Sequence, residues 1–100
     1  MLVPTIPGRR LAQARVVNYM AEVRLRVEAG TDVSWIRQSL DAACRRLDGT
    51  SPGLKILSAV HVMADGRLSC LVTAAGREDV LRLFEIALLP SARVMEVVDV

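Results

Sequence analysis

The chain has 100 residues, enough for one domain, and its 13 basic and 11 acidic side chains give a formal net charge of +2. Arg9, Arg10 and Arg15 supply three of the basic groups, so the rest of the chain is nearly neutral, which argues against a nucleic-acid-binding surface. No stretch approaches the roughly 18 apolar residues of a membrane span, and two cysteines are too few for a disulfide framework. We therefore expect a cytoplasmic protein with reduced thiols that binds neither nucleic acid nor a membrane.

The apolar content is high for so small a domain. Hydrophobic residues make up 52% of the chain and the mean hydropathy is +0.34, but aromatic residues make up only 3%. A small domain has much surface for its volume and cannot bury so many apolar side chains alone. The composition therefore predicts a partner, and the simplest partner is a second copy in a homodimer.

Residues 1–16 contain two prolines and a glycine and show no regular hydrophobic period. We expect a flexible basic arm here, followed by one folded domain over residues 17–100. Two alternatives stay open. The first is that the segment is an over-long gene start, since Met20 can also serve as an initiator. The second is that the arm contacts a partner or an anionic ligand.

Residues 19–28 alternate between apolar and polar side chains, which predicts a half-buried strand. Its polar side carries Glu22, Arg24 and Arg26, which are either solvated or, in a dimer, part of a charged rim. Gly30 breaks the pattern, and the next segment has apolar residues three and four positions apart, typical of a helix. Thr31 or Asp32 can cap this helix. The apolar stripe consists of Val33, Ile36, Leu40, Ala43, Cys44 and Leu47.

Residues 54–63 and 68–74 predict two further strands, joined by Asp65-Gly66, the strongest short hairpin signal. Residues 76–90 predict a second helix that is apolar around most of its circumference, and residues 93–100 predict a fourth strand. Both strands of the hairpin are apolar on each face. The first of them is expected to place Ile56, Val60 and Val62 on one face and Leu57, Ala59 and Met63 on the other.

The element order is β-α-β-β-α-β, which predicts an α+β, ferredoxin-like fold. Right-handed crossovers would place both helices on one face of a four-stranded antiparallel sheet. The other face would be bare, so we expect two copies to pack sheet to sheet, as in a dimeric α+β barrel.

A two-residue turn at Asp65-Gly66 would place His61 directly opposite Cys70, with Met63 two residues further on the same face. Imidazole, thiolate and thioether groups bind zinc, nickel or copper(I), so these three residues are candidate metal ligands. The alternative is that Cys70 packs in the core and His61 completes a hydrogen-bond network. Cys44, on the helix stripe, is expected to pack in the core, and Trp35 either covers the core edge or lines a pocket.

Several short segments resemble a family of small bacterial ferredoxin-like domains of unknown function. Residues 87–97 are similar to its C-terminal signature, A-G-L-P-A-D-R-I-x-E-V, although Leu88 and Ala92 replace its Gly and Asp. Residues 19–22 are similar to its opening Y-L-V-E, Gly53-Leu54 to its G-V strand start and Cys70-Leu71 to its third-strand cysteine. Val72 stands where the family usually has Tyr. The resemblance implies a dimer and, from some actinobacterial members, nickel binding.

The sequence thus leaves three functions open. The first is a dimer that binds a transition metal, with nickel the first candidate and His61, Cys70 and Met63 the ligands to test. The second is a dimeric α+β barrel enzyme, a monooxygenase or isomerase acting on a small organic molecule, with Trp35, His61 and Met63 lining its site. The third is a non-catalytic module that recruits a protein through its apolar sheet face.

Overall fold

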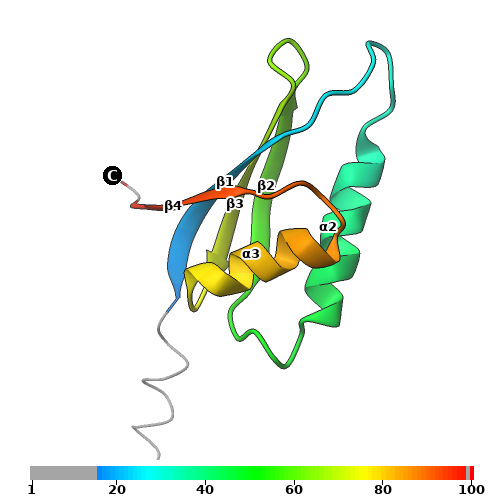
Figure 1. The fold of residues 1–100 in the computed structure, drawn as a ribbon. Helices are drawn as coiled ribbons and strands as arrows, with labels where there is room; N and C mark the ends of the chain where they lie inside the picture. Colours follow the sequence, from blue (N-terminus) through cyan, green and yellow to red (C-terminus); the bar gives the residue numbers. More distant parts are fainter. Residues whose placement is uncertain (1–15, 99) are drawn as a thin grey trace, which may run out of the picture.

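The computed structural model describes residues 16–98 and 100, with four strands and two helices in the order β-α-β-β-α-β (Figure 1). The elements are β1 (Val17–Arg24), α2 (Ser34–Arg46), β2 (Lys55–Val62), β3 (Arg67–Ala74), α3 (Arg77–Ile86) and β4 (Arg93–Val97). The predicted arm, residues 1–16, lies outside the described residues except for Val16. Neither helix in this part of the chain is long and apolar enough to cross a bilayer.

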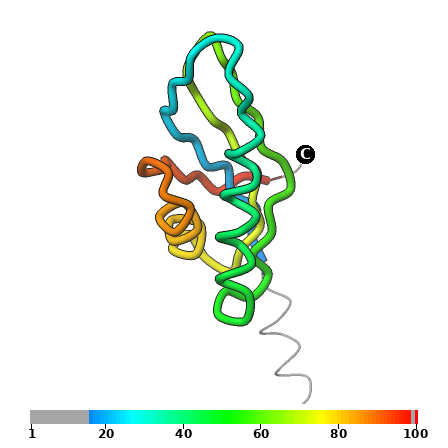
Figure 2. The backbone as a smooth tube through the Cα atoms, turned by 90° about the vertical axis from the view of Figure 1, so that its right-hand side faces the viewer, coloured from blue at the N-terminus to red at the C-terminus, as the bar shows by residue number. Residues whose placement is uncertain are grey.

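The four strands form one antiparallel sheet in the order β2-β3-β1-β4. β1 is therefore a central strand between β3 and β4, although it comes first in the chain. Both helices lie against one side of the sheet (Figures 1 and 2). This arrangement confirms the predicted ferredoxin-like α+β fold.

The core lies between the sheet and the helices and is built almost wholly of aliphatic side chains. Alternate residues of β1, namely Tyr19, Ala21 and Val23, are buried, because successive side chains of a strand point to opposite faces. Each helix adds three buried residues, Ile36, Leu40 and Ala43 from α2 and Val80, Leu83 and Phe84 from α3. Burying a side chain of the size of Leu or Phe contributes about 1.5–3 kcal/mol to stability. The contact between the buried helix residues and the sheet therefore holds the two layers together.

The opposite side of the sheet, which we call the open face, is not covered by any described part of the chain. It is formed by Asn18, Met20, Glu22 and Arg24 of β1, Lys55, Leu57, Ser58, Val60 and Val62 of β2, Arg67, Ser69, Leu71 and Thr73 of β3, and Arg93, Met95 and Val97 of β4.

Local hydrogen bonds mark the start of α2 and the end of α3. The N-cap of α2 is Val33 rather than the predicted Thr31 or Asp32, and it makes no side-chain cap bond. Asp32 instead accepts the N–H of Ser34 on its Oδ1 at 3.0 Å, and this hydrogen bond lowers the pKa of the Asp32 carboxyl. At the end of α3, the N–H of Leu89 donates to the carbonyl of Phe84 at 3.0 Å and that of Leu88 to the carbonyl of Glu85 at 3.1 Å. These bonds form a Schellman motif, and they place Leu88 in the left-handed region at φ 62°.

Two strands, β1 and β4, end earlier than the sequence patterns predict. β1 ends at Arg24 rather than at residue 28, and β4 ends at Val97 rather than at residue 100. The predicted faces of β2 are also partly wrong, because Leu57 is an extra residue between the pairs Ile56–Val72 and Ser58–Leu71. This bulge turns Ile56 toward the helices and Val60 away from them.

Candidate functional site

The predicted neighbours His61 and Cys70 do not lie opposite each other. Val62 pairs with Arg67, so the hairpin loop has four residues instead of the expected two, and the register shifts by two. His61 is therefore opposite Leu68, and Cys70 is opposite Ala59. The Asp-Gly signal correctly places the reversal, and Gly66 does adopt a positive φ of 61°, but the signal does not determine where pairing resumes.

His61 uses both ring nitrogens in local contacts. Its Nε2 lies 2.6 Å from the carbonyl oxygen of Leu25, just after β1, and its Nδ1 lies 3.2 Å from Sδ of Met63. A carbonyl can only accept a hydrogen bond, so Nε2 carries the proton and donates. In the neutral ring this leaves the lone pair of Nδ1 facing the thioether. The structure thus brings together two of the three predicted metal ligands, His61 and Met63.

The third predicted ligand, Cys70, is fully buried in the helix–sheet core. Burial raises the pKa of its thiol to about 11, although the positive charge of Arg37 opposes this shift. The other cysteine, Cys44, donates from Sγ to the carbonyl of Leu54 at 3.5 Å. Burial, followed by the charges of Asp41 and Asp48, raises its pKa as well. Both thiols are therefore held in their protonated, unreactive form at neutral pH.

The described residues contain no group of three or more His, Cys, Asp or Glu side chains placed to hold a metal ion. Two surface hollows lie away from His61, one of about 400 Å³ beside α3 and one of about 430 Å³ after the end of α2. Neither is lined by His61, Met63 or Trp35, and the Trp35 side chain is 41% exposed at the start of α2.

The most distinctive surface is the open face, which is apolar over its middle. Met20, Leu71 and Met95 occupy neighbouring positions on β1, β3 and β4. Toward β2 the apolar surface continues through Leu57, Val60 and Val62, whose side chains are 51%, 56% and 40% exposed. The bulge enlarges this surface, since without the extra residue Leu57 and Ser58 could not both point to the same side.

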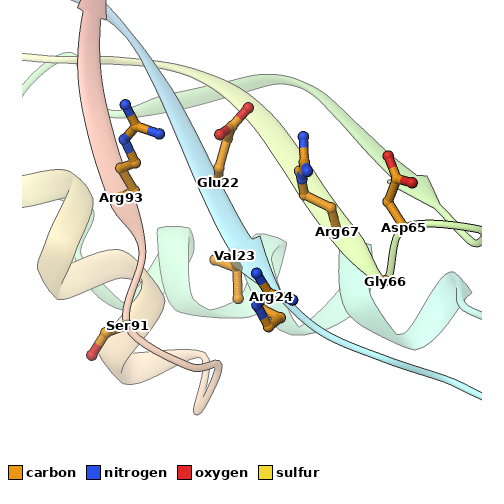
Figure 3. A pocket seen from close by; sticks show the side chains of 8 residues that line it. All are labelled: Glu22, Val23, Arg24, Asp65, Gly66, Arg67, Ser91 and Arg93. Carbon is orange, nitrogen blue, oxygen red and sulfur yellow. The ribbon is translucent and has the colours of Figure 1, made fainter.

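Charged side chains border the apolar surface at one end of the sheet. Four of them, which we call the charged row, project from the open face in the order Arg93, Glu22, Arg67, Asp65 (Figure 3). They line a hollow of about 360 Å³. In the same view Val23 points to the other side of the sheet, into the core.

The register explains how the charged row forms. Arg93 of β4 is directly opposite Glu22 of β1. Arg67 begins β3 opposite Arg24, two residues further along β1 than Glu22, and Asp65 lies in the hairpin loop, so the row crosses the strands obliquely. The alternation of residues 19–28 predicted that Glu22 lies on a polar side that is either solvated or, in a dimer, part of a charged rim. Arg67, Arg93 and Asp65 were missed, because only strand pairing places them beside it.

The described chain thus offers two candidate sites, the His61–Met63 pair and the open face with its charged row. No family model matches the chain, and comparisons with curated protein sequences and with solved structures found no match.

Proposed function

We propose that this chain is a non-catalytic association module, whose open face binds the same face of a second copy to form a homodimer. The observation that carries the proposal is the exposure of Leu57, Val60 and Val62 beside Met20 and Leu71 on the open face. A contiguous apolar patch of this kind on a small domain marks an interaction surface, because its contact with water is unfavourable.

The size of the open face suits a dimer. Three strands have eight residues and β4 has five, so with a spacing of about 4.8 Å and a rise of about 3.3 Å per residue the sheet covers roughly 450 Å² in projection. The accessible surface of such a pleated face is larger than its projection, and it approaches the roughly 800 Å² per partner of a standard interface. We favour a second copy of the chain as the partner. A two-fold axis places the apolar middle of one open face against the same surface of the other copy, so no other partner is needed.

A pair of single substitutions tests the dimer. Val60→Asp would bury an unpaired carboxylate at the interface, and we expect sedimentation equilibrium to show a monomer. Leu81→Asp is the matched control, since Leu81 is an exposed apolar residue on α3, away from the open face, and its replacement should leave the dimer intact. The proposal is refuted if the wild-type protein is monomeric at about 100 µM, a concentration well above the µM dissociation constants of weak specific complexes. It is also refuted if the two substitutions have equal effects on the dimer.

A second candidate function is the binding of a transition metal, nickel or copper(I), at Nδ1 of His61. The contact of 3.2 Å between this nitrogen and Sδ of Met63 favours it, since the two form a nitrogen–thioether pair. The bond from Nε2 to the Leu25 carbonyl also favours it, because metal-binding histidines commonly donate their other N–H to a carbonyl. Cys70 would become the third ligand only by leaving the core and losing its proton.

Calorimetric titration with Ni²⁺, and with Cu⁺ under reducing conditions, tests the metal site. We expect His61→Ala and Met63→Leu each to weaken binding by about tenfold or more, whereas Cys44→Ser should leave it unchanged. Comparison with Cys70→Ser then shows whether that thiol takes part. Wild-type affinity in the His61 variant would exclude this site.

A further inference from the structure

We propose that the charged row determines how two open faces pair, with Glu22 of one copy binding Arg67 of the other and Arg93 of one copy binding Asp65 of the other. This inference rests on the proposed homodimer and adds the orientation of its two sheets. The charges along the row alternate strictly in sign, in the order positive, negative, positive, negative (Figure 3).

The four charged groups have no ion-pair partners within their own chain, as far as it is described. Glu22 and Arg93 are directly opposite each other on neighbouring strands, yet no ion pair of 4.0 Å or less joins any two members of the row. Figure 3 shows the reason, since the side chains extend side by side away from the sheet and present their head groups outward. Arg24, at the end of β1, also lines the hollow but stays at the level of the ribbon.

Symmetry makes an alternating row complementary to itself in one orientation. A two-fold axis that lies between the sheets, perpendicular to the row, reverses the order of the row in the second copy. Each end residue then faces the opposite end, so that Arg93 meets Asp65 and Glu22 meets Arg67, and every contact joins opposite charges. An axis parallel to the row would place each charge against its own copy, which like-charge repulsion disfavours.

The same axis suits the apolar surface. The row lies at one end of the open face, and a rotation about an axis perpendicular to the row keeps the apolar residues of both copies on the same side of it. Met20, Leu71 and Val60 of the two copies would therefore pack together next to the ion pairs. Charged groups at the edge of such an interface specify its register more than its affinity.

Two double substitutions with the same net charge test the pairing. Glu22→Arg with Arg67→Glu exchanges two residues that pair across the interface, so all four contacts stay attractive and we expect a dissociation constant within about threefold of the wild type. Glu22→Arg with Arg93→Glu makes every contact repulsive, and we expect the dimer to weaken by about tenfold or more. Sedimentation equilibrium at about 100 mM salt measures both, and at about 1 M salt the difference should shrink, since screening shortens the reach of charge to about 3 Å.

If the two double substitutions acted only through the stability of the single chain, the variant with Arg67→Glu would be the more damaged one. The comparison therefore separates pairing across the interface from stability within one chain. Glu22→Arg with Arg93→Glu keeps opposite charges across the β1–β4 pair, whereas Glu22→Arg with Arg67→Glu places an introduced arginine opposite Arg93. If both variants dimerise equally, or if the second dimerises better, the pairing is wrong while the dimer itself stands. If the wild-type protein is monomeric, the proposed function fails and the pairing fails with it.

Discussion

Nε2 of His61 lies 2.6 Å from the carbonyl oxygen of Leu25, a residue 36 positions earlier in the chain. The bond joins β2, an edge strand, to the segment that leaves the central strand β1 for α2. It therefore holds the start of the crossover connection against the hairpin. The N–H of Leu25 contributes to the same attachment by donating to the carbonyl of Gly66 at 2.8 Å.

Removal of this imidazole should destabilise the fold. We expect His61→Ala to lower the free energy of unfolding by about 1–2 kcal/mol, because the partly buried Leu25 carbonyl loses its side-chain donor. His61→Gln is the control, since its amide can donate from a similar position and should restore at least part of the loss. Urea denaturation measures both variants, and equal losses would show that the ring packs rather than donates.

Replacement of Leu88 by glycine should stabilise the protein. Leu88 adopts φ 62° at the C-terminal cap of α3, where a side chain costs about 1–2 kcal/mol and glycine costs little. Its side chain is 90% exposed, so no packing is lost. Thermal unfolding should show a higher Tm for Leu88→Gly, whereas Leu88→Ala, which keeps the Cβ atom, should stay close to the wild type. An equal rise for both would point to the loss of exposed apolar surface instead.

Two adjacent hydroxyl groups after α2 should respond in opposite ways to removal. The buried Oγ of Ser51 has no hydrogen-bond partner among the described residues, while Oγ1 of Thr50 donates to the carbonyl of Leu47 at 3.0 Å. We expect Ser51→Ala to be neutral or to stabilise the fold by up to about 1 kcal/mol, because a buried hydroxyl without a partner is unfavourable. Thr50→Ala should instead cost about 1 kcal/mol in the same denaturation assay. Comparable losses at the two positions would contradict this assignment.

Burial of Cys70 should make stability fall at alkaline pH. The thiol has a pKa of about 11 in the folded chain against 9.0 for an ordinary cysteine, so the unfolded chain loses its proton first. Between about pH 9 and about pH 11 the folded state binds more protons than the unfolded state, and the free energy of unfolding decreases as the pH rises. Below pH 9 the contribution of this thiol is fully present.

Cys70→Ala removes this dependence, and its stability should fall less steeply over that interval than that of the wild type. Cys44→Ala is the comparison, since Cys44 also has a raised pKa but is less buried than Cys70. Denaturant titrations at several pH values give the slopes. Identical slopes for the wild type and the Cys70 variant would mean that this thiol ionises equally well in both states.

The order of the elements could be predicted from the sequence because each element has its own hydrophobic period and its own breaking residues. The ends could not, since a strand ends where its partner does. Alternation continues through residue 28, but pairing with β3 stops at Arg24 because β3 begins at Arg67. The residue types in β2 give no indication of the bulge at Leu57. The bulge is evident only in the strand pairing on its two sides.

The site was harder to predict than the fold. Prediction of the His61–Cys70 pair depended on the length of one loop, and two additional loop residues were enough to separate the side chains. Met63 does lie beside His61, as predicted, because this contact depends only on the spacing of residues in β2 and just after it. The charged row draws on three strands and a loop, so the single member visible in the alternation, Glu22, gave no indication of the other three.

The central position of β1 has a consequence for how the chain folds. β1 pairs with β3, about 50 residues later, and with β4, about 75 residues later, so two of the three strand pairings join distant parts of the chain. Such topologies fold more slowly than those built from local contacts, because long loops must close before the pairing stabilises them. On the ribosome, β1 keeps one hydrogen-bonding edge unpaired until β4 has been synthesised, and an intermediate with a free central strand is prone to aggregate.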